Sequence, residues 1–246
     1  MPPDLSSRAA PAPLIGFAHR GGAVRRDQQN TLAAFSRSRN LGATGIESDV
    51  ALTADGVPVL VHPGILTRLG RPVSRLRRDQ LPATVPSLEE VYRECGPHMD
   101  VALDMTAPSA ADKVVAIARE HGDPARLWLT YWRVDALASW RHRYPDVRLV
   151  FPTLLLRPST AARRTSTLRS AGVDAVNLYH RTCTPSRAAI VHGAGMLLFG
   201  WGARSGPAAA RTLHNGADGV FCDDTAGMVA ALRAEQHRRA AVSAGR

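Results

Sequence analysis

Strand-like and helix-like segments alternate eight times along this chain of 246 residues, and no other feature limits the possible folds as much. Each short apolar run has the length of a buried strand, and the segment after it repeats apolar residues at helical spacing. Strands are expected at 14–19, 43–52, 99–105, 127–132, 147–152, 173–179, 195–201 and 217–223. The helices that follow them are expected at 30–42, 86–95, 109–121, 133–143, 159–171, 185–194, 206–214 and about 224–239.

Eight strand–helix units in about 250 residues are typical of a (β/α)8 TIM barrel. A doubly wound α/β sheet usually has fewer units, and neither GxGxxG nor GxxxxGK[ST] follows the first strand. A further run at 57–62 is expected to pair back on the second strand across an Ala-Asp-Gly turn. We therefore predict one α/β TIM-barrel domain over 14–239, with mobile segments at 1–13 and 240–246.

The charge balance favours anionic small molecules over nucleic acid as partners. The chain carries 31 basic and 21 acidic residues, a net charge of +10. Lys113 is the only lysine, so the other thirty basic residues are arginine, and they are spread along the chain. Nucleic-acid binding would need a basic stripe with stacking aromatics, and aromatic residues make up only 5%. Attraction to anionic substrates or phospholipid surfaces remains open.

The cysteines and the apolar runs give an expectation about location. Cys95, Cys183 and Cys222 lie far apart, so they form neither a disulfide framework nor a zinc set. The first residues lack the charged and apolar regions of a signal peptide. No apolar run approaches the ~18 residues of a membrane span. We expect a soluble, cytoplasmic protein without membrane insertion, and its oligomeric state is left open.

Three acidic residues are expected inside the barrel. Glu47 and Asp49 are two positions apart on the second strand, so their side chains face the same side. Asp104 interrupts the apolar third strand in the same way. Buried carboxylates are costly unless they are paired or bind a metal, although a solvated strand end is the alternative. Three inward carboxylates suit a hard cation such as Mg²⁺ or Ca²⁺ and not zinc.

Two histidines and an arginine accompany these carboxylates. His19 and Arg20 end the first strand, and His62 ends the hairpin after the second strand. Catalytic groups of TIM barrels stand at the carboxyl ends of the strands. Two imidazoles there can act as general base and general acid near neutral pH, and a guanidinium is a fork donor for phosphate oxygens.

The order of these motifs resembles the glycerophosphodiester phosphodiesterase family. The resemblance rests on "AHRGG", on "NTLAAFSRSRNLGATGIESDVALTADGVPVLVH", on "VPSLEEVY", and on "FGWGA" and "GADGVFCDD" near the end, and it covers roughly 14–232. It implies the following roles: His19 and His62 as the acid/base pair, Arg20 on the phosphate, Trp201 on the substrate, and Glu47, Asp49 and Asp104 around one divalent cation.

Four positions depart from the family pattern. Gln29 stands where the family has Glu, and Pro63 follows His62 directly where an Asp usually intervenes. The usual Glu-x-Lys is "DMT", so Thr106 replaces a phosphate-binding lysine. "TYW" at 130–132 replaces Ser-Phe-Asp. Because changes around a site alter rate or affinity without abolishing activity, these departures favour an altered substrate.

The sequence is thus compatible with three functions. The first is metal-dependent hydrolysis of a glycerophosphodiester-like small molecule to an alcohol and a phosphomonoester. The second is a specialised enzyme acting on an unusual phosphate ester or diphosphate, or a lyase that forms a cyclic phosphate. The third is a catalytically impaired protein that binds a phosphate ligand.

Overall fold

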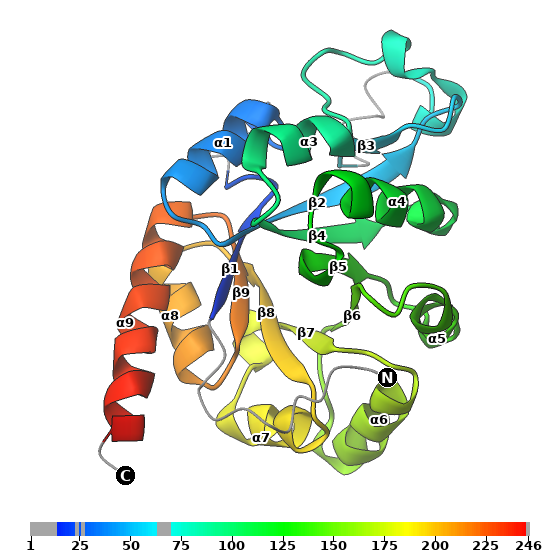
Figure 1. Ribbon diagram of the computed structural model, residues 1–246. Coiled ribbons are helices and arrows are strands. Elements are labelled where there is room, and N and C mark those ends of the chain that lie inside the picture. Colours follow the sequence, from blue (N-terminus) through cyan, green and yellow to red (C-terminus); the bar gives the residue numbers. More distant parts are fainter. Residues whose placement is uncertain (1–13, 23–24, 26–27, 63–69, 245–246) are drawn as a thin grey trace.

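The structure, a computed structural model, describes residues 14–22, 25, 28–62 and 70–244, and it confirms the TIM barrel (Figure 1). The eight parallel strands are β1 (Ile15–His19), β2 (Gly45–Leu52), β4 (Asp100–Met105), β5 (Leu127–Thr130), β6 (Arg148–Thr153), β7 (Ala175–Tyr179), β8 (Leu197–Ala203) and β9 (Gly219–Cys222). The barrel closes because β1 pairs in parallel with both β2 and β9. The short strand β3 (Pro58–Leu60) pairs antiparallel with β2, as the turn predicted.

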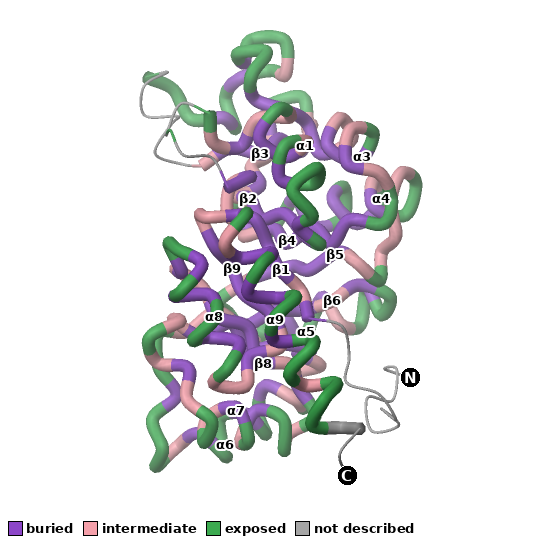
Figure 2. The backbone as a smooth tube through the Cα atoms, turned by 90° about the vertical axis from the view of Figure 1, so that its left-hand side faces the viewer, coloured by how far each residue is buried: buried purple, intermediate pink, exposed green. Residues whose placement is uncertain are grey.

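Helices surround the strands, which form the buried centre of the molecule (Figure 2). The helices are α1 (Leu32–Asn40), α3 (Leu88–Cys95), α4 (Ala111–His121), α5 (Val134–Arg143), α6 (Pro158–Ser170), α7 (Pro185–Gly193), α8 (Gly206–His214) and α9 (Thr225–Ala244). The Ser87 hydroxyl and the Glu90 carboxylate form the predicted capping box of α3. None of the described helices is long and apolar enough to cross a bilayer.

Several element boundaries differ from the sequence prediction by one or a few residues. Where a mobile segment is expected at 240–246, α9 continues as helix to Ala244. Glu235 pairs with Arg238 and Arg239 along one face of α9, and the alanines that follow favour helix. The predicted strand 127–132 ends at Thr130, because the chain then turns outward toward α5. Residues 1–13, 245 and 246 lie outside the described residues.

Side chains inside the barrel form a floor for the site. The floor consists of Phe17, Ala102, Trp128, Val150, Ala175, Phe199 and Phe221, one from each of seven strands. Phe17 stacks on Phe221 with the ring centroids 4.5 Å apart and meets the edge of Phe199 at 5.5 Å. Strand residues two positions apart share a face. The residue two positions after each floor residue therefore lies above the floor, at the carboxyl end of the barrel.

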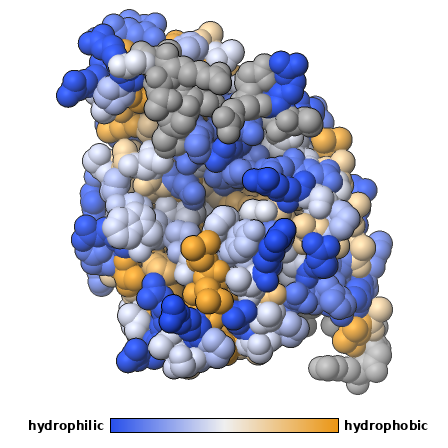
Figure 3. Space-filling model, turned by 180° about the vertical axis from the view of Figure 1, so that it is seen from behind, coloured by the Kyte–Doolittle hydropathy of each residue, from blue (hydrophilic) through white to orange (hydrophobic). Residues whose placement is uncertain are grey.

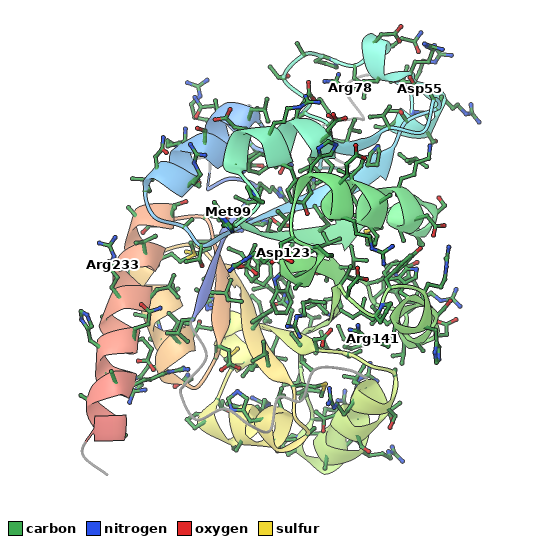
Figure 4. The ribbon with its side chains drawn as sticks, viewed as in Figure 1. Asp55, Arg78, Met99, Asp123, Arg141 and Arg233 are labelled. Carbon is green, nitrogen blue, oxygen red and sulfur yellow. The ribbon has the colours of Figure 1, made fainter. Side chains whose placement is uncertain are left out.

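Segment 70–80 is tied to the turn between β2 and β3, away from the interior of the barrel. The backbone N–H of Arg78 donates to Asp55 at 3.0 Å, and the two residues lie together at one end of the molecule in Figure 4. The guanidinium of Arg78 also donates to Glu90 on α3 at 3.1 Å. These contacts hold segment 70–80 against the turn between β2 and β3 and against α3.

Candidate active site

A cavity of about 990 Å³ opens at the carboxyl end of the barrel, above the apolar floor. Figure 3 shows the side of the molecule opposite to Figure 1, where largely hydrophilic surface surrounds a hollow. The cavity is lined by His19, Arg20, Gln29, Glu47, Asp104, Pro152, Asn177, Tyr179, His180, Arg181, Trp201, Gly202, Arg204, Ser205, Ala208, Arg211, Phe221 and Asp223. It therefore gathers polar residues from strands that are distant in sequence.

His19 is held between two carboxylates. Its Nδ1 lies 2.5 Å from Asp223 Oδ1, and its Nε2 lies 3.8 Å from Glu47 Oε2. Burial alone would lower the pKa of His19, but Glu47 and Asp223 outweigh burial and raise this pKa above its ordinary value. Because a carboxylate only accepts hydrogen bonds, Nδ1 carries the proton toward Asp223, and Nε2 is the nitrogen left available for proton exchange.

Arg20 is fixed by its backbone and leaves its guanidinium largely free to bind a ligand. Its backbone N–H donates to Glu47 Oε2 at 3.0 Å, and its φ of 51° turns the chain sharply. Its Nη1 donates weakly to the amide oxygen of Gln29 at 3.4 Å, and its buried Nε has no partner among the described residues. Since Gln29 is neutral, the charge of Arg20 remains available for an anion.

The loop after β1 is closely packed, which explains its two glycines. Gly22 has a φ of +57°, and a Cβ at this position would lie 1.9 Å from Thr225 Oγ1. The Ser38 hydroxyl donates to the carbonyl of Gly21 at 2.7 Å. The loop therefore rests directly on α1 and on the start of α9, and this contact fixes the position of Arg20.

The three predicted carboxylates lie near one another. Asp49 and Asp104 are direct neighbours across the β2–β4 ladder. Burial raises the pKa of Asp104 to about 8, and the charges of Glu47 and Asp49 add to this effect. Burial likewise raises the pKa of Glu47 and of Asp49. Ionising all three carboxylates together is therefore costly without a further positive charge beside them.

A divalent cation fits this cluster. All three side chains offer oxygen, the ligand that Mg²⁺ and Ca²⁺ prefer, and the buried Oδ2 of Asp49 has no partner among the described residues. Among the described residues, no three carboxylate, histidine or cysteine side chains surround a common point at coordinating distance in their present orientation. Binding a cation would therefore require the carboxylates to rotate toward one another.

The other predicted site residues have distinct places. Trp201 lines the cavity, donates from Nε1 to the carbonyl of Thr153 at 3.2 Å, and packs on Tyr179 with the centroids 5.0 Å apart. His62 follows β3 and does not belong to the described lining of the cavity. Its charge lowers the pKa of Asp49, against the larger effect of burial, so His62 lies on the Asp49 side of the carboxylates.

Comparison with known proteins identifies the family of this chain. Residues 19–226 match the glycerophosphoryl diester phosphodiesterase family. The chain belongs to this family. A probable glycerophosphodiester phosphodiesterase 2 of Mycobacterium tuberculosis is 29% identical, over 85% of this chain and 87% of that protein. Human glycerophosphodiester phosphodiesterase 1 is 37% identical over 104 residues, and the match spans about a third of its length (31%).

Solved structures of this family share the fold. A putative glycerophosphoryl diester phosphodiesterase from Silicibacter pomeroyi gives a TM-score of 0.75 at 20% identity, covering 92% of this chain and 95% of that one. A phosphodiesterase from Oleispira antarctica, in complex with the product sn-glycerol-3-phosphate, also gives 0.75, at 19% identity over 89% and 96%.

Relative to the family pattern, the position of Thr106 is closed off from the site. Its hydroxyl donates to the carbonyl of Val50 at 2.6 Å, and the residue borders a separate, largely apolar cavity of about 580 Å³. The cavity that contains His19 therefore lacks the positively charged lysine side chain that the family pattern has at this position. Pro63, the other departure near His62, lies outside the described residues.

Sequence reasoning missed several residues that line the cavity. Asp223 follows the last strand in "FCDD", and its meeting with His19 depends on the closure of the barrel. Asn177 is a single polar residue within "AVNLY", an interruption of the kind that had identified Asp104. Arg181, Arg204 and Arg211 were also missed, since nothing in the sequence separates them from the other arginines.

Asp223→Asn should lower kcat on the order of 10²-fold, the lower end of what a correctly placed acid/base group contributes. Asparagine at this position can present its amide N–H₂ to Nδ1, which would favour the wrong tautomer of His19. Steady-state kinetics checks this, and Asp223→Glu should recover part of the rate. Asp146→Asn, which alters an exposed pair with Arg119, is the control; equal rates for both asparagine variants would contradict the assignment.

Proposed function

We propose that this protein is a metal-dependent phosphodiester hydrolase that cleaves a glycerophosphodiester-like small molecule to an alcohol and a phosphomonoester. The observation that carries the proposal is the meeting of His19, Arg20 and the Glu47–Asp104 carboxylates in one cavity at the barrel mouth. Membership of the family supports it, as does the relative from Oleispira antarctica that binds sn-glycerol-3-phosphate as product.

In this mechanism, Arg20 binds a non-bridging phosphate oxygen. Its Nε and its free Nη positions donate to the anion, and its fixed backbone keeps the guanidinium in place as charge builds in the transition state. Glu47, Asp49 and Asp104 would hold one Mg²⁺ or Ca²⁺, which supplies further neutralisation of the phosphate charge when it is bound.

The two histidines handle the protons. His19 exchanges its proton at Nε2 while Asp223 holds Nδ1. His62, on the side of Asp49, serves the other reacting oxygen. One imidazole deprotonates the nucleophile and the other protonates the leaving alcohol. Attack by water gives a phosphomonoester, whereas attack by a hydroxyl within the substrate gives a cyclic phosphate.

A screen of phosphodiesters with Mg²⁺, Ca²⁺, Mn²⁺ or chelator tests the proposal, with ³¹P NMR to identify the products. We expect a phosphomonoester in the presence of one of the cations and no turnover with chelator. A cyclic ester that accumulates and persists would replace hydrolysis by cyclisation. If no diester is cleaved with any cation, the proposed function is wrong, and the alternative of a protein that only binds a phosphate ligand is favoured.

A specialised substrate is the second candidate. It is favoured by Thr106, which replaces the lysine of the family pattern and whose hydroxyl donates to the Val50 carbonyl, so that no ammonium group reaches the phosphate from there. The neutral Gln29 beside Arg20 favours it as well. Efficient turnover of glycerophosphocholine would argue against it. The impaired-protein alternative is disfavoured because both histidines and all three carboxylates are present.

A further inference from the structure

Three arginines of the cavity have no part in the mechanism above. Arg181 lies in the short 3₁₀ turn after β7 (His180–Thr182), Arg204 follows β8, and Arg211 lies on α8. All three line the cavity. We call them the arginine wall.

The three side chains of the arginine wall are exposed to solvent where they line the cavity. Within the described residues, none of its three side chains lies within 4.0 Å of a carboxylate or donates a hydrogen bond. Arg141 pairs with Asp174 and Arg119 pairs with Asp146, whereas other exposed arginines, such as Arg233, also lack a carboxylate partner among the described residues. The arginine wall differs from these because its three members line one cavity. Three argininium groups so placed repel one another, although solvent screens the repulsion, and a bound anion would relieve it.

The electrostatic effects on neighbouring groups show that these charges act on the same space. After burial, Arg181 and Arg211 are the two causes that lower the pKa of His180. Arg204 lowers the pKa of Asp223, although less than the hydrogen bond from His19 does. The charges of the arginine wall therefore act on His180 at one side of the cavity and on Asp223, the partner of His19, at the other.

Asn177 gives an independent sign of a missing ligand in the same cavity. It lies on β7 and lines the cavity, and only 5% of its surface is exposed. Its Oδ1 has no hydrogen-bond partner among the described residues. Since a buried polar atom without a partner is costly, this side-chain amide is well placed to bind a hydroxyl of the substrate.

The start of α8 adds to the positive field. Ser205 occupies the N-cap position and lines the cavity, and its hydroxyl does not cap the helix. The N–H of Gly206 is already taken by Asp224 at 3.0 Å. The positive end of the helix dipole and the Ser205 hydroxyl nevertheless face the cavity near Arg204.

The charge balance points to the substrate. A simple glycerophosphodiester carries one negative charge, and in the proposed mechanism Arg20 and the cation held by the carboxylates already bind it. We propose that the arginine wall is a second anion subsite, and that the substrate is a glycerophosphodiester whose other alcohol carries a carboxylate or a phosphate group. This rests on the proposed function. The subsite would disfavour cationic head groups such as choline by like-charge repulsion.

Four diesters of sn-glycerol 3-phosphate test the subsite by kcat/KM at low salt. Their second alcohols are glyceric acid, glycerol phosphate, glycerol and choline, so the first three differ mainly in a terminal carboxylate, phosphate or hydroxyl. We expect at least about a tenfold preference for an anionic ester over the glycerol ester, expressed mainly in KM, since charge-assisted hydrogen bonds are strong. The choline ester should be the poorest. The ratio of the first two shows which anion the subsite takes.

The double variant Arg181→Gln/Arg211→Gln should reduce this preference to within about threefold of unity, as expected if charge-assisted bonds are lost. Arg233→Gln is the matched control, because Arg233 is exposed on α9, outside the lining of the cavity (Figure 4). A preference that survives in the double variant, or equal kcat/KM for the first three esters in the wild type, would overturn the subsite while leaving the proposed function intact.

Binding is measured separately from turnover. Calorimetry compares non-cleavable phosphonate analogues of the glyceric acid and glycerol esters, in which a methylene replaces the bridging oxygen of the second alcohol. Tighter binding of the carboxylate analogue that disappears in the double variant supports the subsite even if no ester is cleaved, a result that would remove only the proposed hydrolysis. Equal dissociation constants for the two analogues would refute a carboxylate subsite, and equal binding of the phosphonate analogue of the glycerol phosphate ester as well would refute the subsite altogether.

Discussion

His19→Ala should lower kcat toward a glycerophosphodiester by about 10³-fold or more, within the range that general acid–base catalysis contributes. The loss follows from the position of the imidazole, whose Nδ1 is held by Asp223 while Nε2 faces the side of Glu47. Alanine removes the group that exchanges the proton and leaves the apolar floor beneath it unchanged. Single-turnover kinetics would show the loss in the chemical step, and circular dichroism would show a folded protein. His62→Ala should behave in the same way.

The molecule contains a matched control for this experiment. His192 on α7 pairs through Nε2 with Asp218 at 2.8 Å, so it forms a histidine–aspartate pair that does not line the cavity. His192→Ala should therefore retain the activity of the wild type. If His19→Ala and His62→Ala also retain it, the acid/base assignment is wrong and the reaction needs other proton carriers.

Asp104→Asn should raise the cation concentration that gives half-maximal activity by on the order of 10²-fold, the upper end of the loss typical of a supporting residue around a metal. Asp104 is half-buried beside Glu47 and Asp49, and the amide keeps its shape while it removes one negative charge. A thermal-shift assay gives a readout independent of turnover: Mg²⁺ or Ca²⁺ should raise the Tm of the wild type by mass action, and much less that of the variant.

The control for this variant lies on the same strand. Asp100 is buried at the opposite end of β4, where it accepts hydrogen bonds from Trp128 at 2.8 Å and Arg126 at 2.9 Å. Asp100→Asn should lower the Tm because it breaks this pair, but it should keep the shift caused by the cation. Full activity of the wild type in excess chelator would contradict the metal hypothesis directly.

The fold could be predicted from the sequence because each level of the chain carries the same signal. Apolar runs of strand length, the Ser87–Glu90 capping box and the Ala-Asp-Gly turn all favour the elements that the structure contains. The polar interruptions of otherwise apolar strands also placed Glu47 and Asp104 in the cavity. Local sequence determined these features, and the barrel needed only to bring them together.

Features that depend on distant contacts could not be predicted. Asp223 is 204 residues from His19, and the two meet only because β9 pairs with β1. The hydroxyl of Thr106 could have faced the cavity, and its hydrogen bond to the Val50 carbonyl is visible only in three dimensions. The arginine wall was hidden among thirty arginines of similar sequence context, since the missing carboxylate partners are a property of space and not of sequence.

The pairing of β1 with β9 also has a consequence for how the active enzyme is made. His19 lies near the beginning of the described chain, and Asp223 lies on the segment that follows its last strand. During synthesis, the ribosome must therefore release almost the entire barrel before the histidine acquires its partner. A nascent or truncated chain can contain the histidines and the carboxylates and still lack the aligned imidazole. In the proposed mechanism, catalysis begins only when the two ends of the sheet have met, so enzymatic turnover would report on completed folding.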